Sequence, residues 1–185
     1  MKQHERKGIH KQYLLNKNKT PPSEAKERAE EMRLNEVELH VFNSSSELDG
    51  NTGVFGLGVS YVGQSQVITK SRKFYFPTQK GKIQQVMVQS MIFSLIKLED
   101  ILLCKIIKPK IVNIYSTLES NGIDVLGHHP LYLSNNVQYI NQLFNKLNRD
   151  FHDISFHHMQ LDKGLRTYNP FFKAANNAAR NIIQK

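Results

Sequence analysis

The spacing of apolar residues along the chain predicts a series of strands and helices. Short stretches with alternating apolar residues, bounded by Gly, Pro or Asn, are typical of strands. Longer stretches in which apolar residues recur every three or four positions indicate helices. The expected strands are 39–43, 54–62, 67–76, 111–115 and 151–159, and the expected helices are 82–98, 137–147 and 169–183. This order predicts an α/β fold, with a mixed five-stranded sheet flanked by helices.

The N-terminal part of the chain differs in character from the rest. Residues 1–22 contain six basic residues and one acidic residue without a regular apolar period, so we expect a flexible basic arm. Residues 23–36 predict a short, highly charged helix with little apolar face. Residues 37–185 carry the apolar periodicity and have a suitable length for one domain.

The first two expected strands form a recognisable hairpin. The strand 39–43 is followed by the turn Gly50-Asn51-Thr52-Gly53 and by a strand with glycines at alternate positions, Gly56 and Gly58. This hairpin resembles the opening of ribonuclease H, where a Gly-Asn-Pro-Gly turn follows a strand that ends in a catalytic aspartate. The run 174–179 in the last helix is also similar to that family. The resemblance covers residues 38–183 and implies a ribonuclease H-like fold.

The resemblance also implies an active site, and this chain departs from it at each ligand position. Ribonuclease H cleaves RNA in RNA–DNA hybrids with two divalent metal ions, which several carboxylates must hold. The matching positions here are Ser44 (or Asn43 with a small register shift), Met87, Thr117 and Asn176. Serine and asparagine each give one neutral oxygen, and methionine gives no useful ligand for magnesium. The resemblance therefore implies a domain that has lost its catalysis and holds no metal.

A rearranged active site is the alternative. Glu47, Asp49 and Glu119 lie in or near the loops that would surround the site. Glu119-Ser120 matches the family's Asp-Ser pair if the loop is two residues longer. Magnesium would then be the cofactor, although loop carboxylates usually only solvate a turn.

Histidine and cysteine give no metal motif. His128-His129 and His157-His158 are adjacent pairs, and neighbouring residues on a strand point to opposite faces. No Cys-x-x-Cys or helical His-x-x-x-His pattern accompanies them, so we expect no zinc site. The single cysteine, Cys104, has no internal disulfide partner, and we expect a buried thiol in a reducing cytoplasm.

The charge balance suggests a polyanion as partner. The net charge is +9, from 25 Lys and Arg against 16 Asp and Glu. Nucleic acid fits this charge through counterion release, whereas solubility alone is the simpler explanation. Residues 70–76 mix bases with aromatic rings, which suits phosphate contacts and stacking, but lysines also keep an edge strand soluble. The candidate nucleic-acid-binding residues are Lys7, Lys11, Lys17, Lys19, Lys70, Arg72, Lys73, Lys80 and Lys82.

Three functional hypotheses follow. The first is a catalytically inactive ribonuclease H-like module that binds nucleic acid weakly and non-specifically or acts in regulation. The second is a metal-dependent ribonuclease H with a rearranged site, and the third is a protein-interaction module. We expect no membrane contact because no apolar run reaches the ~20 residues of a membrane span. We expect a cytoplasmic location because the charged N-terminus has no apolar signal core.

Overall fold

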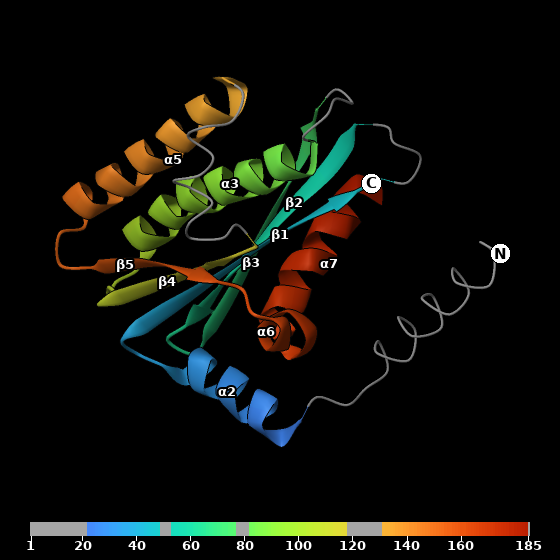
Figure 1. Ribbon diagram of the computed structural model, residues 1–185. Helices are drawn as coiled ribbons and strands as arrows, with labels where there is room; N and C mark the ends of the chain where they lie inside the picture. Colours follow the sequence, from blue (N-terminus) through green and yellow to red (C-terminus); the bar gives the residue numbers. More distant parts are fainter. Residues whose placement is uncertain (1–21, 49–52, 77–81, 118–130, 185) are drawn as a thin grey trace.

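The computed structural model describes residues 22–48, 53–76, 82–117 and 131–184, and its described strands form one sheet (Figure 1). In chain order the elements are α2 (Ser23–Leu34), β1 (Glu38–Glu47), β2 (Val54–Gly63), β3 (Gln66–Tyr75), α3 (Lys82–Cys104), β4 (Ile111–Ser116), α5 (Leu131–Asp150), β5 (Ser155–Gln160), α6 (Lys163–Tyr168) and α7 (Pro170–Gln184). The strand order is β3-β2-β1-β4-β5. Strands β1, β2 and β3 pair antiparallel, whereas β4 pairs parallel with both β1 and β5. The expected mixed five-stranded α/β fold is confirmed.

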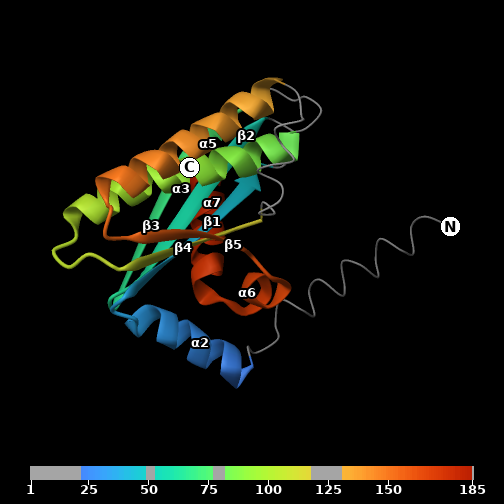
Figure 2. The same ribbon diagram turned by 60° about the vertical axis from the view of Figure 1, so that its left-hand side comes forward.

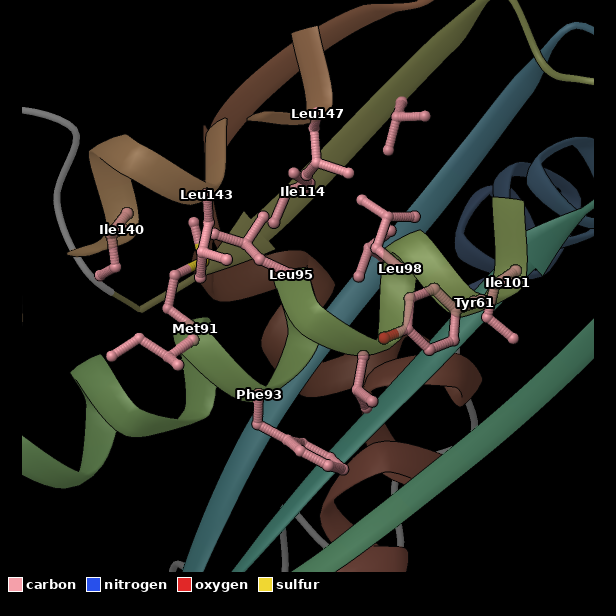
Figure 3. Close-up of a cluster of buried hydrophobic side chains, with 14 of the residues drawn as sticks. Tyr61, Met91, Phe93, Leu95, Leu98, Ile101, Ile114, Ile140, Leu143 and Leu147 are labelled. Carbon is pink, nitrogen blue, oxygen red and sulfur yellow. The ribbon is translucent and has the colours of Figure 1, made fainter. Parts of the chain in front are cut away.

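The sheet separates two apolar cores. Helices α3 and α5 cover one face, and α2, α6 and α7 lie on the other (Figures 1 and 2). Because side chains alternate along a strand, each inner strand supplies both cores. The core under α3 and α5 is the larger one, and Figure 3 shows several of its leucines and isoleucines, with Tyr61 at one side near Leu98 and Ile101. The Tyr61 hydroxyl is buried there and donates a hydrogen bond of 2.8 Å to the backbone oxygen of Ser94.

The second core holds the N-terminal helix against the sheet. Phe42 of β1 stacks on Tyr115 of β4, with ring centroids 4.7 Å apart. Ala29 and Met32 of α2 are buried in the same cluster, beside Phe171 of α7. Although α2 has little apolar face, as its sequence predicts, these two side chains join it to the sheet.

Helix α7 lies unusually close to strand β2. A Cβ atom added at Gly58 would lie 2.0 Å from the backbone oxygen of Ala175, and one at Gly56 would lie 1.7 Å from that of Ala179. Real Cβ atoms do not approach other atoms so closely, so only glycine fits at these two positions. The alternate glycines of the hairpin motif therefore form the part of β2 against which α7 packs.

Helix α3 is longer than its apolar pattern suggests. The expected end was residue 98, but the helix continues to Cys104 because Ile101 and Leu102 still face the core. The ammonium group of Lys108 then donates hydrogen bonds to backbone oxygens at the helix end, including that of Lys105 at 2.8 Å. The expectation of a buried Cys104 is wrong, since its side chain lies on the exposed side of the last turn.

The C-terminal third differs from the prediction at two boundaries. Strand β5 begins at Ser155 and not at residue 151, because α5 extends to Asp150 and a turn follows. In that turn the Ile154 N–H donates to the Phe151 oxygen at 2.9 Å. Helix α6 was not predicted, because six residues are too few for a periodic pattern. The Asp162 carboxylate caps it by accepting from the Leu165 N–H at 2.7 Å.

Two further expectations concern the ends and the surroundings of the domain. The basic arm lies outside the described residues except for Pro22. Within the described parts of the chain, none of the helices combines the length and the apolar character that crossing a bilayer requires.

We predict that Gly58→Ala will lower the free energy of unfolding by about 3 kcal/mol, the upper end of the usual cost of overpacking, because the new methyl group would overlap the backbone of α7. Urea unfolding monitored by circular dichroism would measure the change. Gly164→Ala is the matched control, since its nearest new neighbour would be a side-chain oxygen, that of Asp162 at 3.2 Å, and not a backbone atom. Equal losses of unfolding free energy in the two variants would contradict the close packing of α7 on Gly58.

Candidate functional site

The candidate site lies where the parallel strands β1 and β4 end. Phe42 of β1 is level with Tyr115 of β4, so Ser44 and Thr117, each two residues further on, reach the same level of the sheet. Ser44 is still within β1 and pairs with Gly58 of β2. The register thus brings two of the four expected positions to one end of the sheet.

Hydrogen bonds fasten this end of β1 to its neighbours. The buried Asn43 side-chain amide donates to the backbone oxygen of Tyr115 at 3.2 Å and to the sulfur of Met91 in α3 at 3.7 Å. The Ser90 hydroxyl of α3 donates to the backbone oxygen of Ser44 at 3.1 Å. Hydrogen bonds between neutral groups therefore join β1 to β4 and to α3.

Met87 and Asn176 come from helices on opposite faces of the sheet. Met87 lies one turn before Met91 on α3 and packs, half-buried, against the larger core. Asn176 follows Ala175, whose backbone covers Gly58, the partner of Ser44 in β2. No hydrogen bond among the residues that the structure describes joins Met87 or Asn176 directly to Ser44 or Thr117.

The Asn176 amide has an unsatisfied acceptor. Its oxygen, Oδ1, is buried and has no hydrogen-bond partner in the described part of the chain. A buried acceptor without a donor costs about 1–3 kcal/mol, so this oxygen is a local weak point of α7.

These residues do not fit a pair of divalent metal ions. Magnesium is held in proteins by carboxylates, and the four positions offer two hydroxyls, a thioether and an amide. Among residues 22–48, 53–76, 82–117 and 131–184 no group of three or more His, Cys, Asp or Glu is placed to hold a metal ion. Glu47 is the exposed last residue of β1, and Asp49 and Glu119 lie outside the described residues.

A serine and a histidine meet beside Thr117. The Ser116 hydroxyl and His158 Nε2 are 2.6 Å apart, and Ser116 is buried. Burial lowers the pKa of His158, because the imidazolium form loses hydration there. His157 is exposed on the other side of β5, as the alternation predicts, and His128-His129 lies outside the described residues.

The expected basic segment is divided between the two faces of the sheet. Strand β3 is an edge strand, and Lys70 and Arg72 are exposed opposite Val59 and Leu57, on the side of α3. Lys73 pairs with Gly56 and so belongs to the face of α7. Lys82 is the first residue of α3, and the remaining candidates Lys7, Lys11, Lys17, Lys19 and Lys80 lie outside the described residues.

The sequence prediction did not include the two buried serines of α3. Ser90 and Ser94 are buried serines in an otherwise apolar helix face, and this interruption of the pattern is the signal that points to them. Ser94 donates to the Met91 backbone oxygen at 2.7 Å. Buried hydroxyls of this kind need partners, and here they find them in the helix and the adjacent strand.

Comparisons with solved structures place the fold. No family model and no curated protein matches the sequence. LC11 ribonuclease H1, isolated from compost by a metagenomic approach, is 14% identical, with a TM-score of 0.50 over 80% of this chain and 99% of that chain. Its complex with an RNA/DNA hybrid gives 14% identity and a TM-score of 0.47 over 78% and 99% of the two chains. The prototype foamy virus protease–reverse transcriptase gives 14% identity and a TM-score of 0.49 over 78% of this chain, which spans only 20% of that protein.

At 14% identity, the similarity shows a shared fold and nothing beyond it. The expected ribonuclease H fold is confirmed by the LC11 enzyme, almost all of which is matched.

We predict that stability will fall as the pH drops below about 6.5, the ordinary pKa of histidine. His158 has a lowered pKa in the fold, so the unfolded chain binds the proton first and acid favours unfolding. His158→Gln should reduce the slope of unfolding free energy against pH by less than about 1.4 kcal/mol per unit, since the ring is partly exposed. Urea unfolding between pH 5 and pH 7.5 would measure it.

The exposed His152 supplies the control for this measurement. The slope measured for His152→Gln gives the effect of replacing an exposed histidine, and His40, whose pKa burial also lowers, remains as a background in both variants. If His158→Gln and His152→Gln gave the same slope as the unsubstituted protein, His158 would not be neutral in the fold.

Proposed function

We propose that this chain is a non-catalytic ribonuclease H-like module that binds nucleic acid. The observation that carries the proposal is the end of β1, where neutral groups hydrogen-bond to one another in place of a carboxylate cluster. Asn43 is committed to Tyr115 and Met91, and Ser90 to the backbone of Ser44. Because these groups are engaged with one another, the contacts support a structural role for this end of the sheet over metal binding.

The loss of catalysis follows from the chemistry of phosphodiester cleavage. Two metal ions stabilise the attacking and leaving oxygens, and anionic ligands must hold these ions together. Hydroxyl, thioether and amide groups carry no charge, so they give little attraction for Mg²⁺. Ser44, Met87, Thr117 and Asn176 therefore support a domain that keeps the fold without the reaction.

Charge supports nucleic acid as the ligand. The net charge of +9 favours a phosphate backbone, because each contact releases a condensed counterion. The cations of β3 stand on an edge strand, where a strand of nucleic acid has access. Since the similarity to LC11 ribonuclease H1 extends to the fold alone, the binding proposal depends on this charge.

A protein-interaction module is the second candidate. Ile106 and Ile107 are 100% and 73% exposed beyond the end of α3, and Leu103 is 65% exposed. Ile106 and Ile107 line a groove of about 490 Å³ together with Gln64, Ile101 and Lys105. Exposed apolar clusters of this kind often mark binding surfaces for other proteins.

We predict that the purified protein will not cleave an RNA–DNA hybrid in Mg²⁺ or Mn²⁺, because the ligand positions have no carboxylates. A gel assay with a labelled hybrid would test this. Robust turnover that is abolished by changing Glu47, Asp49 or Glu119 would contradict the proposal and favour the rearranged nuclease.

Substitutions that place carboxylates at the four ligand positions supply a control for this experiment. The combined variant Ser44→Asp, Met87→Glu, Thr117→Asp and Asn176→Asp should bind Mn²⁺ measurably by isothermal titration and should be less stable without it, because crowded carboxylates repel one another. A folded variant without any binding would show that these four positions do not surround one site.

We predict weak, sequence-independent and salt-sensitive binding of nucleic acid. Affinity should fall steeply between about 50 and 200 mM salt, as the counterion effect requires. Deleting residues 1–20 removes six basic side chains and one acidic one, so it should weaken binding and flatten the salt dependence. Fluorescence anisotropy with DNA, RNA and hybrid probes would measure both effects.

A variant that keeps the arm but replaces its six basic residues with Gln is the matched control for length. It should behave like the deletion. If the full-length protein bound none of the probes at low salt, the protein-interaction module would become the leading candidate.

A further inference from the structure

We propose that the outer surface of α6 and α7, continued by the adjoining side of β3, is the surface on which the phosphates of a nucleic-acid strand lie. The inference rests on the proposed function and gives it a place on the molecule. Helix α7 has one face against the sheet (Figures 1 and 2). Helix α2 borders its N-terminal end at Lys173, and the rest of its outer face is exposed. We call this surface the α7 face.

The exposed residues of the α7 face are all suited to phosphate. Ala175 and Ala179 are buried against β2, and the opposite side of the helix is solvent-exposed. Its exposed residues after the first turn are Lys173, Asn177, Arg180, Asn181 and Gln184. Each carries hydrogen-bond donors, and both charged ones are cations, so the stripe offers donors to anionic oxygens along its whole length.

Carboxylates are missing from this region of the sequence. Residues 163–184 contain Lys163, Arg166, Lys173 and Arg180 and no Asp or Glu. Asp162 immediately precedes them, and its side chain is used as the N-cap of α6. No ion pair within the described residues involves these four cations.

On the opposite face of the sheet, by contrast, cations are paired with anions. On α3 and α5, Lys97 lies 2.8 Å from Asp100 and Lys146 lies 2.6 Å from Glu99. Cations that serve only to solvate a surface are normally mixed with anions in this way. The charged residues of α6 and α7 are all cations, and such a surface attracts a polyanion over a distance. Glu30 of the neighbouring helix α2 lines a groove together with Lys173, but its carboxylate is paired with Arg33.

Strand β3 extends the α7 face sideways. Lys73 pairs with Gly56, where the backbone of Ala179 covers β2, so Lys73 lies beside α7. Thr69 and Ser71 are exposed on the same side of β3 and add hydroxyl donors. The α7 face is therefore wider than α7 alone, which gives a phosphate backbone a broader surface to contact.

The spacing along α7 suits a nucleic-acid backbone. Lys173 and Arg180 are seven residues apart, which corresponds to about 10 Å of helix at 1.5 Å per residue. That length matches roughly three phosphates of one strand of a duplex. The exposed stripe of α7 has no aromatic residue, but Tyr75 is 69% exposed on the same side of β3 as Lys73 and offers a ring for stacking at the edge of the α7 face. Stacking on such a ring tolerates any base, so binding is expected without sequence preference.

The double variant Lys173→Gln and Arg180→Gln tests the assignment in the full-length protein. Affinity for a labelled DNA strand and for an RNA–DNA hybrid should fall about tenfold at low salt, and the slope of log affinity against log salt should decrease by about 1.4 to 1.8. Fluorescence anisotropy would measure both, and thermal unfolding would verify the fold. Lys163→Gln with Arg166→Gln, on a different helix, should give an effect in the same direction.

The matched control is Lys97→Gln with Lys146→Gln, which removes the same charge from the opposite face. This variant should bind within twofold of the unsubstituted protein. Equal weakening by the control and by the α7 variants would overturn the assignment and leave only a general charge effect. Absence of binding by the unsubstituted protein would instead contradict the proposed function itself, so the two failures are distinguishable.

Discussion

Strand β1 is hydrogen-bonded on both sides, and this pairing fixes the rest of the molecule. It runs antiparallel to β2 and parallel to β4, so one side of it continues a hairpin and the other receives a crossover through α3. Its alternate side chains enter both cores, with Val41 in the larger core and Phe42 in the smaller one. A shift of one residue would exchange the two sets and bury the wrong groups, which explains why the register is firmly specified.

Because β1 is fixed, the end of the strand is also fixed, and the identity of the residues there decides its chemistry. A cluster of carboxylates at this place would be held against its own repulsion by metal ions. Neutral residues remove that repulsion and can bond to one another, as Asn43 does with the backbone of Tyr115. On the side of α7 the polar groups are less well satisfied, since the buried Oδ1 of Asn176 has no hydrogen-bond partner among the described residues.

The sequence predicts much of this fold because its strands have strong alternation and its hairpin has a specific turn. It fails where tertiary contacts decide. The end of α3 depends on Lys108, which reaches back from beyond the helix, and no local pattern announces such a cap. Cys104 lies among apolar residues in the sequence but is on the solvent side of the last turn. Residues 70–76 read as one basic segment, whereas the two-residue period of β3 places Arg72 and Lys73 on opposite faces.

The close packing of α7 on Gly56 and Gly58 has a mechanical consequence. Most helices rest on a sheet through long side chains, which can change rotamers and absorb small displacements. Here the backbone of Ala175 and Ala179 lies directly on the backbone of β2, with no side chain between them to yield. Helix and strand should therefore move as one stiff unit, and a load applied to the outer side of α7 would pass into the centre of the sheet with little loss.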